Sequence, residues 1–100
     1  MNYSIDWTFS AINSYGEEID FIFLKWNHNE VLKFETLVEI ELERLSKNPT
    51  LGVLRLENIY SLILSKQTTL FYKIKNDDFS IELLLLWNTQ KNPSHLNKLL

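Results

Sequence analysis

Residues 49 to 87 read PTLGVLRLENIYSLILSKQTTLFYKIKNDDFSIELLLLW, and this stretch decides the fold. Its first four residues, Pro49 to Gly52, end a helix, because proline cannot continue one. Beyond Gly52 the apolar side chains recur with a period of about two, which is the period of a strand. Short polar turns divide the rest into four strand-like runs, at residues 53–56, 59–65, 69–75 and 81–87. Consecutive strands joined by short turns predict an antiparallel meander.

One short strand and two amphipathic helices are predicted before this stretch. Apolar and polar side chains alternate over residues 2–7, as in a half-buried strand. Thr8 can cap the first helix, and either Asn27 or Asn29 can cap the second. Because the linker between the helices is short, they are expected to form an antiparallel αα-hairpin. Their apolar stripes comprise Ile12, Tyr15, Ile19, Phe23 and Trp26 in the first helix and Val31, Phe34, Val38, Leu42 and Leu45 in the second.

These elements predict an α+β fold with the order β-α-α-β-β-β(-β), in which an antiparallel sheet packs against the αα-hairpin. The last run is apolar on both faces from Leu83 onward, which is typical of a strand inside a sheet. With 100 residues, the chain is expected to form one domain over residues 1–100.

The composition excludes several chemistries. There is no cysteine, which removes disulfides and thiolate chemistry and suits a reducing cytoplasm, where we expect this protein. The longest apolar run, Leu83 to Trp87, is far too short to span a bilayer, and residues 1–7 have no secretory signal pattern. No metal-ligand cluster, carboxylate pair or glycine-rich phosphate loop occurs in the sequence. We therefore expect neither a metal nor another cofactor.

The charge is unevenly distributed along a chain whose formal net charge is −3. Residues 1–50 contain 4 Lys/Arg and 9 Asp/Glu, a balance of −5. Residues 51–100 contain 6 Lys/Arg and 4 Asp/Glu, a balance of +2. A phosphate-bearing partner is therefore expected to meet the sheet half, and the overall acidity argues against tight, non-specific binding of nucleic acid.

Taken in chain order, these features resemble the RelE/ParE superfamily of bacterial toxins, the toxin halves of type II toxin-antitoxin pairs. The likeness spans nearly the whole chain. The matching positions are Trp7 at the end of the first strand, followed by Thr8 and Ala11 at the helix start; Leu45, Pro49 and Gly52 at the helix-to-sheet transition; Leu54-Arg55 in the next strand; Phe71-Tyr72-Lys73-Ile74 in an aromatic strand; and residues 86–93, which are similar to a terminal motif of the form hydrophobic-Asp-x-Arg-x-x-Pro.

The resemblance implies a growth-inhibiting toxin that is neutralised by a cognate antitoxin. RelE-like members cleave messenger RNA in the ribosome, whereas ParE-like members bind DNA gyrase. In the terminal motif of this chain Asn88 stands where Asp is usual, and Gln90 stands where Arg is usual. The missing arginine favours the ParE-like branch, with DNA gyrase as the first candidate target. The alternatives are a ribosome-dependent mRNA endoribonuclease and a decayed, non-toxic binding module.

If the chain is an enzyme, the resemblance implies an endoribonuclease. Cleavage of RNA by its own 2′-hydroxyl needs a base, an acid and positive charge around the phosphate. The candidate catalytic residues are the cations Arg55, Lys73, Lys75 and Lys91. Lys73 and Lys75 share one strand face by alternation. The structural alternative is a solvated sheet face for both lysines and a surface ion pair for Arg55.

Overall fold

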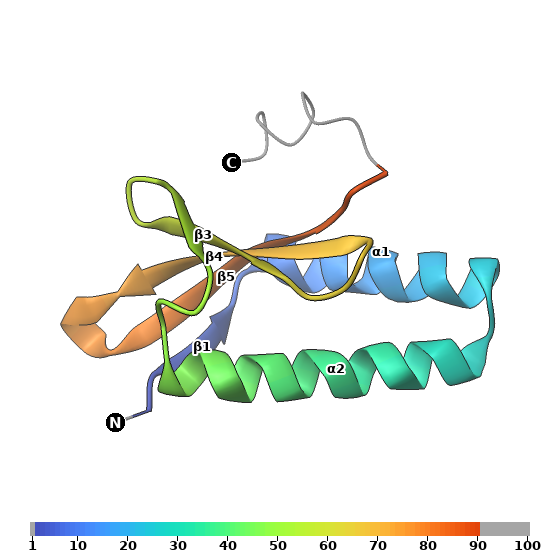
Figure 1. The fold of residues 1–100 in the computed structure, drawn as a ribbon, viewed down its shortest axis with the longest axis horizontal. Coiled ribbons are helices and arrows are strands. Elements are labelled where there is room, and N and C mark those ends of the chain that lie inside the picture. The colour runs from blue at the N-terminus through green and yellow to red at the C-terminus, as the bar shows by residue number, and fades with distance from the viewer. Residues whose placement is uncertain (1, 91–100) are drawn as a thin grey trace.

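The computed structural model describes residues 2–90, which fold into two helices and a five-stranded sheet (Figure 1). The predicted α+β class and element order are confirmed. A 3-10 turn, η1 (Asn76–Asp78), joins the last two strands. The other elements are, in chain order, β1 (Ser4–Trp7), α1 (Phe9–Lys25), α2 (His28–Lys47), β2 (Val53–Leu56), β3 (Ile59–Ile63), β4 (Thr68–Lys75) and β5 (Ser80–Asn88).

Strands β2 to β5 form the predicted antiparallel meander, within the spatial order β1-β5-β4-β3-β2. β5 lies inside the sheet, as its apolar character on both faces predicted. On its other side β1 runs parallel to β5, with Ser4 opposite Ser80 and Trp7 opposite Leu83. The sheet is therefore mixed and not wholly antiparallel as predicted. The connection between the parallel strands β1 and β5 is long, because it runs through both helices and through β2 to β4.

Side-chain caps set the beginnings of both helices. The Thr8 hydroxyl accepts a hydrogen bond from the Ala11 N–H at 3.1 Å, and the same hydroxyl donates to the Leu83 carbonyl at 2.7 Å. The start of α1 is thereby attached to β5. The Asn27 side-chain oxygen accepts from the Glu30 N–H at 3.0 Å, so Asn27 is the cap of α2.

Both helices lie on one side of the sheet and enclose the main core (Figure 1). α1 packs along β5, and α2 packs beside α1. The buried side chains of this core are Ala11 and Ile22 from α1, Val31, Phe34, Val38 and Leu45 from α2, and Leu64, Leu70, Tyr72, Ile74, Ile81, Leu83 and Leu86 from the sheet and its turn.

A β-bulge in β5 explains how Leu83 and Leu86, three residues apart, both face the main core. Phe71 is paired with Leu85 and Tyr72 with Leu83, so Leu84 has no partner on β4. The extra residue changes the alternation, and Leu83 and Leu86 both belong to the main core. The buried hydroxyl of Ser14 on α1 accepts the N–H of Leu86 at 2.9 Å. A side chain of α1 thus provides the hydrogen-bond acceptor for a backbone N–H next to the bulge.

Candidate functional site

The sheet has one face covered by the helices and one face that points away from them, which we call the open face (Figure 1). Strand register and pleating determine which side chains it carries. On β2 to β5 these include Val53, Arg55, Ile59, Ser61, Ile63, Thr69, Phe71, Lys73, Lys75, Glu82, Leu84, Leu85 and Trp87.

The centre of the open face is an apolar cluster separate from the main core. Phe71, Leu85 and Trp87 form it, and Ile59 and Leu84 pack against them. Phe71 is 8% exposed and Trp87 is 5% exposed. A base can stack only on an accessible ring, so these aromatic residues do not offer a stacking platform.

Three of the four predicted site residues lie on the open face. The Arg55 Nε donates to the Ser61 hydroxyl at 2.7 Å, which directs the guanidinium over β3. Lys73 on β4 is opposite Ile59 on β3 and Glu82 on β5. Since β3 separates β2 from β4, the backbones of Arg55 and Lys73 are about 10 Å apart, two inter-strand spacings. The fourth residue, Lys91, lies outside the described residues.

The open face therefore carries dispersed positive charge rather than a compact catalytic group. Arg55, Lys73 and Lys75 form no ion pair within residues 2–90. No tyrosine or histidine joins them on the described strands, and Tyr72 faces the helices, where its hydroxyl donates to the Pro49 carbonyl at 2.8 Å. Such a surface can attract a phosphate or an acidic segment, but it lacks an evident acid-base pair.

The end of β5 faces the helices and not the cations. Asn88 is 3% exposed, and its side-chain oxygen accepts the N–H of Gln90 at 2.8 Å. Both residues line a cavity of about 300 Å³ with Glu17, Glu18 and Phe21 of α1. Gln90, which stands where the RelE/ParE terminal motif usually has arginine, thus lies beside the carboxylates of Glu17 and Glu18, on the side of the sheet opposite Lys73.

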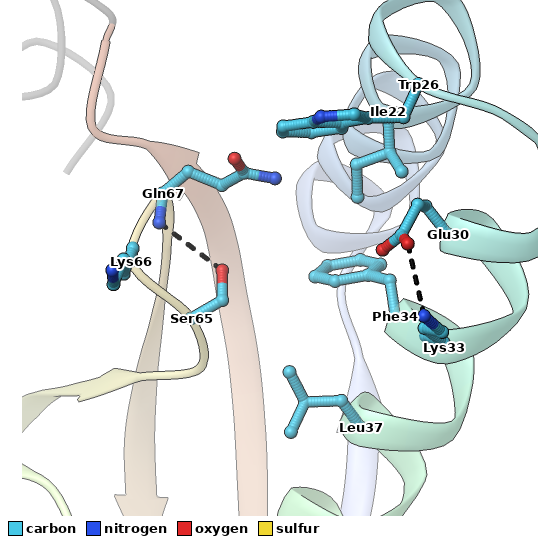
Figure 2. Close-up of a pocket in the computed structure, with 9 residues that line it drawn as sticks. All are labelled: Ile22, Trp26, Glu30, Lys33, Phe34, Leu37, Ser65, Lys66 and Gln67. Carbon is cyan, nitrogen blue, oxygen red and sulfur yellow. Dashed lines mark hydrogen bonds and ion pairs between the residues drawn. The ribbon is translucent and has the colours of Figure 1, made fainter.

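A second hollow lies between α2 and the turn that joins β3 to β4. Its volume is about 310 Å³. Figure 2 shows the apolar side chains of Trp26, Phe34 and Leu37 on one side and the Ser65–Gln67 turn on the other, with the Gln67 side chain pointing toward the helices. An ion pair between Glu30 and Lys33, at 3.2 Å, lies at its rim. We call this hollow the α2 groove.

Sequence reasoning did not find the α2 groove. Two of the residues that line it, Trp26 and Phe34, belong to the predicted helix stripes, which the pattern assigns to the core. The only local signal is the polar turn at residues 65–67, and nothing in the spacing shows that this turn stands away from α2. Tertiary packing decides whether a stripe residue is buried or lines an opening.

Strand β2 is an exposed, apolar edge of the sheet. Val53, Leu54 and Leu56 are 57%, 55% and 67% exposed. Among the strands of residues 2–90, β2 pairs with β3 alone, so its outer backbone groups have no neighbouring strand there. An edge of this kind can accept an added strand from another chain.

Among residues 2–90, no group of three or more His, Cys, Asp or Glu side chains is arranged to hold a metal ion. Within the same range, neither helix is long and apolar enough to cross a membrane.

No protein-family model matches this sequence, and no curated protein matches it. Solved structures match it in fold. The chromosomal ParDE system from P. aeruginosa has a TM-score of 0.72 at 15% identity, over 88% of this chain and 97% of that chain. The RelBE2 toxin-antitoxin complex from Mycobacterium tuberculosis has a TM-score of 0.63 at 20% identity, over 88% of this chain and 99% of that chain. A mutant of the E. coli toxin RelE in the free state has a TM-score of 0.63 at 13% identity, over 100% of both chains. This chain therefore has the fold of the RelE and ParE toxins of toxin-antitoxin systems.

Proposed function

We propose that this chain is the toxin of a type II toxin-antitoxin pair, that it inhibits growth by binding a cellular target, and that a cognate antitoxin neutralises it. The supporting observation is the similarity to toxin-antitoxin structures over 97% to 100% of their chains. DNA gyrase is the first candidate target.

Binding, as opposed to catalysis, is supported by the arrangement of the open face. A nuclease needs its cations around one phosphate, whereas Arg55 is tied to Ser61 and Lys73 is opposite Glu82. Gln90 lies beside Glu17 and Glu18 and brings no positive charge. The TM-score is also higher for the ParDE system, at 0.72, than for the RelE mutant, at 0.63.

The cognate antitoxin has two suitable surfaces on this chain. The β2 edge can pair with an extended segment, and the α2 groove can take an apolar side chain. Both contain apolar side chains that the fold leaves accessible, such as Leu54 at the edge and Trp26 in the groove, at 55% and 47% exposure.

Inducible expression of the chain alone in a bacterium tests the proposal, with soluble protein confirmed in each culture. We expect growth to stop, and co-expression of the protein encoded by the neighbouring gene to restore it. Purified chain added to DNA gyrase should inhibit plasmid supercoiling. Normal growth with abundant folded protein would contradict a toxin, and growth arrest with unaffected gyrase would contradict the target.

A ribosome-dependent endoribonuclease is the second candidate, because Arg55, Lys73 and Lys75 share the open face. Translating ribosomes are incubated with the chain, and the ends of the transcripts are mapped. New ends that disappear in the double variant Lys73→Ala and Lys75→Ala, but persist in the α2 variant Lys33→Ala, would support it. If growth, gyrase and transcripts are all unaffected, the chain is a non-toxic binding module.

A further inference from the structure

Helix α1 carries an apolar stripe that points away from the core. Phe9, Ile12 and Phe23 are 78%, 54% and 53% exposed. Together with Gly16 they are spaced by three, four and seven residues, which places them on one side of the helix. We call these four residues the outer stripe. It is separate from the open face and from the α2 groove.

Gly16 lies at the middle of the outer stripe, where nothing in residues 2–90 requires a glycine. Glycine is among the least favourable residues in a helix interior. Its backbone has no positive φ angle, and a Cβ atom built there would meet nothing within 4 Å. Neither backbone conformation nor packing within residues 2–90 therefore requires glycine. What the missing side chain does provide is a notch where a second backbone can approach α1 closely.

Both helices of the hairpin contribute carboxylates. Asp20 follows Gly16 by one helical turn, and Glu35 and Glu39 lie on α2 near the ring of Tyr15. Burial raises the pKa of the Tyr15 phenol, and the charges of Glu35 and Glu39 raise it further. Within residues 2–90, Asp20, Glu35 and Glu39 form no ion pair.

The cations of the two helices are engaged elsewhere. Lys33 pairs with Glu30, Arg44 with Glu41, and Lys47 with Glu43, at 3.2, 2.9 and 3.2 Å. The Lys25 ammonium lies over the rings of Phe21 and Trp26, at 5.4 and 4.9 Å from their centroids. The charges of Asp20, Glu35 and Glu39 are therefore not neutralised by an ion pair within residues 2–90.

We propose that the outer stripe is a docking face for a basic amphipathic helix of a partner protein. The partner helix places a small residue against Gly16 and apolar side chains against Phe9, Ile12 and Phe23, with Lys or Arg on its flanks facing Asp20, Glu35 and Glu39. A second copy of this chain does not fit, because the same carboxylates would then face one another. The inference does not depend on the chain being a toxin.

Three fluorescent 18-residue helical peptides test the charge requirement. They share one face of alanine and leucine and carry Lys, Gln or Glu along its flanks. We expect the Lys peptide to bind the folded full-length chain, with affinity falling as salt rises. The Gln peptide should bind about tenfold more weakly, and the Glu peptide not at all. No binding of the Lys peptide, or equal binding of the Glu peptide, would overturn the proposal.

The variant Gly16→Ala tests the notch. The added methyl has open space in the free chain, so the melting temperature should rise by about 4–8 °C. The same methyl should weaken binding of the Lys peptide about tenfold, because it separates the two backbones. Ser10→Ala, an exposed position off the outer stripe on the same helix, should leave the affinity unchanged. Equal affinity of Gly16→Ala and the unmodified chain would refute a close approach at this position.

Discussion

The hydroxyl of Tyr72 accepts a hydrogen bond from the N–H of Gly52 at 2.9 Å, although 20 residues separate them in the chain. The same hydroxyl donates to the carbonyl of Pro49 at 2.8 Å. Tyr72 is fully buried on β4. The linker that ends α2 and begins the meander is thus attached to the middle of the sheet by one side chain.

Replacing Tyr72 by Phe keeps the ring and removes both hydrogen bonds. A carbonyl and an N–H are then left without their partner, so we expect the free energy of unfolding to fall by about 1–3 kcal/mol. Urea denaturation followed by circular dichroism measures the change. Tyr60→Phe is the matched control, because its ring stacks on Tyr72 at 5.4 Å but its hydroxyl forms no hydrogen bond within residues 2–90. Equal losses in both variants would contradict the role of the hydroxyl.

The two glycines of the chain should respond to alanine in opposite directions. A Cβ at Gly52 would lie 2.5 Å from the Ser61 carbonyl oxygen and 2.9 Å from the Tyr72 hydroxyl, so backbone must move. We expect Gly52→Ala to destabilise the chain by about 1–3 kcal/mol. Gly16→Ala should stabilise it by about 1 kcal/mol, since its site is open. Thermal melting of both variants decides this, and the same sign for both would be inconsistent with the structure.

The hydroxyl of Ser14 accepts a hydrogen bond from the backbone N–H of Leu86, beside the bulge of β5. Without the hydroxyl, the buried N–H of Leu86 loses its partner at 2.9 Å. We expect Ser14→Ala to reduce the free energy of unfolding by about 1–3 kcal/mol, and amide exchange at Leu86 to accelerate. Ser10→Ala, which is exposed on the same helix, should change stability by less than about 0.5 kcal/mol. An unchanged exchange rate at Leu86 would argue against this hydrogen bond.

Stability should fall at alkaline pH. Burial raises the pKa of Tyr72 above its ordinary value of 10.0, partly offset by the hydrogen bond from Gly52, and burial also raises that of Tyr15. A raised pKa means that the folded chain holds the proton more tightly than the unfolded chain. The stabilisation is complete below pH 10.0 and is lost as pH rises through the folded-state pKa.

Denaturation at several pH values above 9 gives the slope of the free energy of unfolding against pH. Tyr72→Phe should make the slope shallower, because it removes one of the two described tyrosines whose pKa is raised. A slope that is identical in the variant and the unmodified chain would exclude Tyr72 as a source of the pH dependence.

The β2 edge is expected to bind the antitoxin without contributing much to the fold. Leu54 is 55% exposed, so Leu54→Asp should change the free energy of unfolding by less than about 1 kcal/mol. If the protein encoded by the neighbouring gene pairs with β2, the variant should bind it at least about tenfold more weakly. Calorimetric titration measures this, with Ile40→Asp on α2 as the control at 53% exposure. Equal binding by both variants would place the antitoxin elsewhere.

Local patterns in the sequence determined the elements and part of the site. The change of period at Gly52, the cap at Thr8 and the polar turns depend on neighbouring residues, which is why the order of helices and strands could be predicted. Alternation alone also puts Lys73 and Lys75 on one face.

Only the tertiary structure decided how these elements meet. The parallel pairing of β1 with β5, the strand that separates Arg55 from Lys73 and the opening of the α2 groove join residues far apart in the chain. Likewise, the sequence shows Gly16 as an unfavourable helix residue, but its open surroundings appear only in the fold. Periodicity is a property of one segment, whereas these contacts depend on the packing of several segments at once.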